Sequence, residues 1–252
     1  MELLGYILVF SFLGSVVSLI GGVLLLANEK FALRISHFLS AFAGGALLGT
    51  AFFDLLPEAL AEAGEVDIFL WTLIGILGFF LLERFIHHHE QTQSPNEKKT
   101  VVPLIIIGDS IHNFIDGVAM AGTFLVSIPL GIVTSLAVAA HEIPQEIGDF
   151  GLMLHKGVKK SKVLWINFWS AMAAMLGAVV TYQAQTYIQG LLPAVLGLTS
   201  GFFIYIALTN LIPEIHSRED QKMAFWETMM LLLGVAVIYF LITLLDNLGL
   251  TV

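Results

Sequence analysis

The stretch LLGYILVFSFLGSVVSLIGGVLLL, from Leu3 to Leu26, is an unbroken apolar run without a charged residue. A helix rises about 1.5 Å per residue and needs roughly 20 residues to cross the ~30 Å hydrocarbon core of a bilayer. No basic segment precedes the stretch and no small-residue cleavage site follows it, which argues against a removable signal peptide. The stretch therefore predicts a membrane span.

Further apolar runs of similar length follow along the chain, which is 57% hydrophobic and only 12% charged. A soluble domain carries about a quarter charged residues. We therefore predict an all-α integral membrane protein in which residues 1–252 form a single transmembrane domain. Its eight transmembrane helices are expected near residues 3–27, 36–57, 68–86, 101–126, 129–155, 161–184, 189–215 and 223–247.

The basic residues predict how the chain is oriented in the membrane. All 11 lysines and arginines fall on the same side of the eight-span arrangement, and cytoplasmic loops are the ones enriched in these residues. Both termini are therefore predicted outside. The polar segment HHHEQTQSPNEKKT, residues 87–100, becomes a cytoplasmic loop, and the protein is expected in the cell membrane as a multi-pass protein.

Composition also limits the partners. The net charge of -9 argues against nucleic acid, because phosphate binding needs a basic surface. The chain has no cysteine, so a disulfide or a thiolate metal site is impossible and any metal must take nitrogen and oxygen ligands. The lipid bilayer remains as the expected environment.

Two polar stripes interrupt the fourth and fifth predicted spans. The fourth span reads VVPLIIIGDSIHNFIDGVAMAGTF from Val101 to Phe124, and its polar residues share one helical face because they recur at i, i+3, i+4 and i+7. Ionisable side chains inside a bilayer are costly and usually pair, face the bundle interior or line an ion pathway. The two stripes consist of Asp109, His112, Asn113 and Asp116, and of His141, Glu142, Gln145, Glu146 and Asp149.

The two stripes are expected to meet at the membrane midplane. His112 and His141 each lie roughly 16 to 18 Å along their helices, at about 1.5 Å per residue. A very short turn joins the spans, so we expect antiparallel neighbours. Imidazole and carboxylate are ordinary ligands of borderline divalent cations, and Pro144 is expected to unwind the helix locally near Ala140. The sequence therefore predicts a divalent-metal site on these spans.

Three other interpretations fit part of this pattern. The polar residues could merely bridge helices, or the carboxylates could relay protons. The pair His141 and Glu142 also suggests an intramembrane metallohydrolase, but a zincin helix needs HExxH and this segment reads HEIPQ. We therefore expect a protein that is not an enzyme, and the spacing alone does not separate an importer from an exporter or a proton-coupled carrier.

The motifs HNFIDG, from His112 to Gly117, and HEIPQEIGD, from His141 to Asp149, resemble those of the ZIP, or Zrt/Irt-like, divalent metal transporters. The eight spans, the outside termini, the histidine-containing loop and LLPEA, from Leu55 to Ala59, extend the resemblance over most of the chain. The HExPxExGD string is closest to the branch with eukaryotic histidine-rich members. The resemblance implies import of zinc into the cytoplasm by alternating access, with no resident cofactor.

The resemblance also implies two neighbouring metal positions at the midplane, with Glu146 among the candidate ligands. Gln145 stands where relatives carry glutamate or histidine, and the sixth span offers Asn167 and Ser170 but no acid. We therefore expect one strong site and a weaker neighbour. Two imidazoles favour zinc, although the oxygen-rich surroundings also suit cadmium(II), iron(II), manganese(II) and cobalt(II). The transport position would use His112, Asp116, His141 and Gln145, with Asn113 and Glu142 facing the adjacent position.

Polar residues nearer the span ends are candidates for the ion path. A homodimer is compatible with the sequence, which does not determine the oligomeric state. The path candidates are Asp54 and Glu58 towards the outside, Asp149, His155, Asn210 and Glu214 towards the cytoplasm, and Asp109 on the fourth span.

Overall fold

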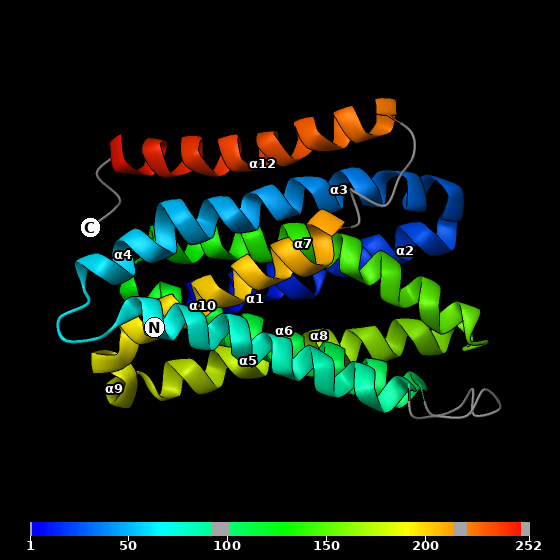
Figure 1. Ribbon diagram of the computed structural model, residues 1–252. Helices are drawn as coiled ribbons and strands as arrows, with labels where there is room; N and C mark the ends of the chain where they lie inside the picture. Colours follow the sequence, from blue (N-terminus) through cyan, green and yellow to red (C-terminus); the bar gives the residue numbers. More distant parts are fainter. Residues whose placement is uncertain (1, 92–100, 214–220, 248–252) are drawn as a thin grey trace.

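The computed structural model describes residues 2–91, 101–213 and 221–247, and the regular elements within these ranges are all helical (Figure 1). Most of the predicted loop 87–100 and all of Glu214 lie outside the described residues. The side chains of His87, His88 and His89 are likewise outside them.

The described residues form eight helical rods, three of which are built from several short segments in sequence. The rods are α1 (Glu2–Ser15) with η1 (Val17–Leu19) and α2 (Ile20–Ala27); α3 (Glu29–Thr50) with η2 (Ala51–Leu55) and α4 (Leu56–Ala61); α5 (Ile68–Gln91); α6 (Val101–Val126); α7 (Ile128–His155); α8 (Lys160–Gln183); α9 (Gln185–Ile188) with η3 (Gln189–Leu191), α10 (Leu192–Ile206) and η4 (Ala207–Leu211); and α12 (Gln221–Asn247).

Length and composition allow six helical segments of the described residues to cross a membrane. Helices α6 and α7, with 26 and 28 residues, are also long enough to cross a membrane, but they are not among these six segments. These are the two helices that carry the polar stripes. The all-helical membrane fold expected from the sequence is confirmed.

Local sequence signals explain where the central helices end. Ser127 alone separates α6 from α7, and its hydroxyl oxygen accepts a hydrogen bond from the Leu130 amide at 3.3 Å. This cap satisfies one of the free amides at the start of α7. The one-residue connection leaves α6 and α7 as neighbours that pack on each other. At the other end of α7, Gly157 adopts a φ of +83°, a left-handed conformation that glycine tolerates and that closes the helix.

The rods pack as two groups. The first group is α1, α2, α6, α7 and α8, in which α6 packs on α8 and α1 packs on both α7 and α8. The second group is α3, α5, α10 and α12, in which α12 packs on α3 at one edge of the molecule and α5 packs on α10 (Figure 1). The main contact between the groups is α3 against α7.

The helices differ from the expected spans in three places. α3 begins at Glu29 and not near residue 36, because Asn28 caps it by accepting from the Phe31 amide at 3.1 Å. α5 continues to Gln91, into the predicted loop. The expected unwinding at Pro144 was wrong, since α7 is continuous across this buried proline. An apolar run marks only the part of a helix that lies in the bilayer, and the helix itself can continue beyond that run through polar turns.

Candidate metal centre

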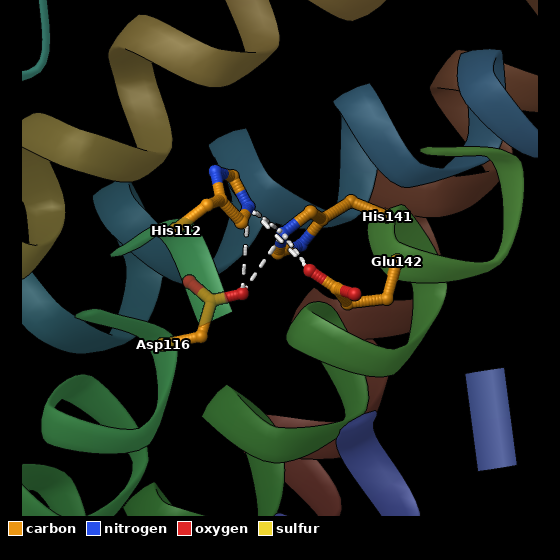
Figure 2. A group of neighbouring side chains, drawn as sticks. All are labelled: His112, Asp116, His141 and Glu142. Carbon is orange, nitrogen blue, oxygen red and sulfur yellow. Dashed lines mark hydrogen bonds and ion pairs between the residues drawn. The ribbon is translucent and has the colours of Figure 1, made fainter. Parts of the chain in front are cut away.

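Four buried side chains from α6 and α7 converge in the interior of the bundle, as Figure 2 shows: His112, Asp116, His141 and Glu142. We call these four residues the central cluster. One ligand atom from each lies within 4.8 Å of all the others. The Nε2 atoms of His112 and His141 are 3.2 Å apart, and His141 Nε2 lies 3.2 Å from Asp116 Oδ2. The pattern of one histidine and one carboxylate from each helix follows from the two stripes.

The spacing of these atoms fits a tetrahedral metal site. Four ligands at about 2.0 to 2.1 Å from one zinc ion are separated by about 3.3 to 3.4 Å. In the central cluster, His112 Nε2 lies 3.6 Å from Asp116 Oδ2 and 3.5 Å from Glu142 Oε1, and His141 Nε2 lies 3.7 Å from Glu142 Oε1. The donor set of two nitrogens and two oxygens also matches the preference of zinc.

A backbone contact orients the His141 ring for ligation. His141 Nδ1 lies 3.2 Å from the carbonyl oxygen of Ala137. A carbonyl oxygen only accepts hydrogen bonds, so Nδ1 carries the proton in the neutral ring and Nε2 presents its lone pair to the cluster. Metal-bound histidines typically donate their second ring N–H in this way.

The carboxylates of the central cluster are short of hydrogen-bond donors. Within the described residues, Asp116 Oδ2 and both carboxylate oxygens of Glu142 are buried without a hydrogen-bond partner. A buried carboxylate without compensation is costly, because burial removes its hydration. A divalent cation held between the four side chains would offset that cost, so the arrangement fits a positively charged ligand.

A second polar group lies beside the central cluster. The Asp109 carboxylate accepts hydrogen bonds from Asn113 Nδ2, at 2.9 Å, and from the hydroxyl of Ser170 on α8. Asn113 is thereby held by Asp109. Glu146 is buried with both carboxylate oxygens unpartnered within the described residues.

The membership of the central cluster differs from the ligand set that the family resemblance implied. Glu142, expected to face the adjacent position, contributes an oxygen to the central cluster itself. Gln145 is half-buried one turn after His141, and Glu146 is not among the four residues of the cluster.

The candidates for the ion path are not among the four residues of the cluster either. Asp54 lies in η2 and Glu58 in α4, both half-buried. Asp149 is half-buried on α7, His155 is exposed at the end of that helix, and Asn210 is exposed in η4.

Aromatic residues from the second helix group contact the cluster, and the sequence had not indicated them. The ring of Phe79 on α5 meets the His112 ring edge to face, with 5.4 Å between the centroids. Phe203 on α10 approaches the His141 ring at 6.4 Å. Both phenylalanines are buried, so they exclude water from one side of the cluster.

Replacing Phe79 by alanine should weaken zinc binding by roughly tenfold. The change opens space beside His112, admits water and frees the imidazole ring from an aromatic contact worth about 0.5 to 1.5 kcal/mol. Zinc affinity measured by competition with a chelating dye would show the loss. Phe69→Ala, which removes an exposed phenylalanine of the same helix, is the matched control and should bind zinc like the parent. Equal affinities for both variants would contradict a role for Phe79.

The helical membrane fold and the central cluster define a membrane protein that can hold a divalent metal ion inside its transmembrane bundle. The sequence model of the ZIP zinc transporter family matches residues 4–104 and 87–242 of this chain. The chain therefore belongs to the ZIP zinc transporter family.

Individual relatives agree with this assignment. Zinc transporter ZIP13 from Pongo abelii is 34% identical over 229 residues, which cover 84% of this chain and 68% of that protein. Human zinc transporter ZIP13 is 31% identical over 268 residues, covering 84% of this chain and 72% of the relative. Zinc transporter ZIP4 from Rattus norvegicus is 28% identical over 276 residues, covering 80% of this chain and 42% of that protein.

Proposed function

We propose that this protein carries zinc ions across the cell membrane into the cytoplasm, with both termini outside and zinc as the substrate. The observation that carries the proposal is the central cluster. Its four ligand atoms have near-tetrahedral spacing, it is buried within the transmembrane bundle, and the chain belongs to a family of zinc transporters. Cadmium(II), iron(II), manganese(II) and cobalt(II) are the competing substrates that the donor set also suits.

Alternating access by the two helix groups is the proposed mechanism. All four residues of the central cluster belong to α6 and α7 in the first group, whereas Phe79 and Phe203 belong to the second. A shift of the first group against the second would carry the bound ion past these aromatic rings. The site would then open to one side of the membrane at a time, as in transporters whose binding site lies near the midplane.

We further propose unequal metal positions. The central cluster is the strong site, and Gln145, four residues after His141 on α7, is a further candidate ligand. Asp109, Asn113 and Glu146 provide a weaker neighbouring position, because the Asp109 oxygens already accept hydrogen bonds from Asn113 and Ser170. In a homodimer, each protomer would carry its own set of positions.

Metal flux into liposomes tests the proposed function. The purified protein is reconstituted, and uptake of zinc is compared with uptake of cadmium and manganese. We expect metal-selective flux in the parent and its loss in His112→Ala and Glu142→Ala, since each substitution removes one of the four ligands. A parent protein that binds zinc without moving it would contradict transport and favour an enzyme or a sensor.

A further inference from the structure

A cavity of about 520 Å³ lies at the end of the bundle where α2 is joined to α3 and α7 to α8. Four leucines form its apolar part: Leu25 and Leu26 from α2, Leu33 from α3 and Leu154 from α7. None of the four residues of the central cluster lines it. The cavity is therefore a separate feature. Its walls come from both helix groups, because α3 belongs to the second group and α2 and α7 belong to the first.

The other part of the cavity is polar and lies at helix ends. It is formed by Glu29 at the start of α3, His155 at the end of α7 and Lys160 at the start of α8, all of them exposed. The N-terminus of α8 has no side-chain cap, and free amides at a helix N-terminus favour an anion. The connection around it, residues 155–162, reads HKGVKKSK, with four lysines and no acid. This part of the cavity therefore suits a negatively charged group.

The polar part of the cavity lies at the boundary of the membrane. Glu29 and Lys160 are the first residues of two segments that could cross a membrane, Glu29–Ala61 and Lys160–Gln183. The exposed Trp165 follows about 7.5 Å further along α8, at about 1.5 Å per residue. Tryptophan is enriched where a membrane meets water. The polar part is therefore at the depth of phospholipid headgroups, while Leu25 and Leu33 lie inside their spans.

We propose that this cavity binds one anionic phospholipid of the adjoining leaflet, of the phosphatidylglycerol type. The phosphate lies at Lys160 and the N-terminus of α8, and an acyl chain lies along the four leucines. Headgroup hydroxyls donate to Glu29, which a choline headgroup cannot do because it has no hydrogen-bond donor. A free phosphate ion would leave the leucines uncovered. On the proposed topology the leaflet is the cytoplasmic one, where anionic lipids attract basic segments.

Native mass spectrometry of the purified protein, mixed with dioleoyl phosphatidylglycerol and dioleoyl phosphatidylcholine, tests the proposal. We expect each chain to retain one phosphatidylglycerol in preference to phosphatidylcholine. Lys160→Gln should weaken this retention about fivefold, the loss expected for one lysine near a lipid headgroup. The matched control is Lys162→Gln, which removes the same charge from a residue that does not line the cavity, and it should retain the lipid like the parent. Equal losses in both variants would indicate diffuse attraction to the basic connection and overturn the proposal.

Filling the apolar part of the cavity is a second test that leaves every charge in place. Gly151 lines the cavity, and a Cβ atom there would meet Leu25 Cδ2 at 3.7 Å, an ordinary contact. A leucine side chain at this position can therefore extend into the cavity. Gly151→Leu should weaken retention of phosphatidylglycerol about tenfold, by displacing about two methylene groups of the acyl chain.

Gly148→Leu is the control for the filled cavity, because Gly148 is exposed on the same helix and its Cβ would have no neighbour within 4 Å. It should retain the lipid like the parent, and both leucine variants should keep the parental melting temperature. Parental retention in Gly151→Leu, or displacement of the lipid by excess glycerol 3-phosphate, would overturn the proposal. Lipid retention is measured without zinc, so the outcome is independent of the proposed function.

Discussion

His141→Ala should lower the affinity for zinc by at least about 100-fold, which corresponds to about 2.7 kcal/mol. The side chain is fully buried, and its Nε2 lies 3.2 Å from both His112 Nε2 and Asp116 Oδ2. Removing it leaves three ligands, one imidazole and two carboxylates, which hold the ion less tightly than four. Titration with a competing chelator would measure the affinity, and transport should fall to background in the same preparation.

The control for this variant is Thr134→Val, which lies two turns earlier on α7. Thr134 is fully buried, and its hydroxyl is unpartnered within the described residues, so the nearly isosteric valine should fit without loss. We expect parental zinc affinity and a parental melting temperature. If His141→Ala kept an affinity close to that of Thr134→Val, His141 would not be a ligand.

Gly117→Ala should destabilise the fold by about 3 kcal/mol or prevent folding, the upper end for overpacked sites. A Cβ atom at Gly117 would lie 1.9 Å from the carbonyl oxygen of Ala174 on α8. The obstacle is backbone, so no rotamer change relieves it, and α6 must move away from α8. Since α6 carries His112 and Asp116, any folded fraction should also bind zinc more weakly. Thermal unfolding in detergent gives the stability.

Two further glycines make this test a graded series. At Gly122 a Cβ would meet one side-chain atom, Cγ1 of Val195, at 2.9 Å and no backbone atom, so Gly122→Ala should cost less than Gly117→Ala. At Gly148, on α7, a Cβ would have no neighbour within 4 Å, and Gly148→Ala should be neutral or slightly stabilising because alanine favours helix. Equal melting temperatures for Gly117→Ala and Gly148→Ala would contradict close packing of α6 on α8.

Helical periodicity is sufficient to identify the two site helices from the sequence. The spacing of the polar residues was enough to find the stripes on α6 and α7. The short connection at Ser127 then implied that the two helices are antiparallel neighbours. The place of Glu142 was harder to predict. The family resemblance implied that Glu142 faces the adjacent position, and neighbours such as His141 and Glu142 do point about 100° apart on a helix. Where two helices meet, a long glutamate side chain can still reach the shared centre.

Other features depend on tertiary packing that the sequence does not reveal. Phe79 looks like any aromatic residue of an apolar span, and only the packing of α5 and α10 brings it against His112. Prolines are equally ambiguous. Pro144 lies within a continuous α-helix, whereas Pro57 and Pro213 each follow a π-helical turn. The same local signal thus has different outcomes in different surroundings.

Zinc K-edge X-ray absorption of the protein loaded with one equivalent of zinc tests the central claim most directly. We expect two imidazole nitrogens and two carboxylate oxygens at about 2.0 to 2.1 Å from the zinc ion, with no sulfur. His141→Ala at the same loading should lose one imidazole from this spectrum. A zinc ion bound by water and carboxylate oxygens alone, or a spectrum unchanged in His141→Ala, would contradict a metal site at the central cluster.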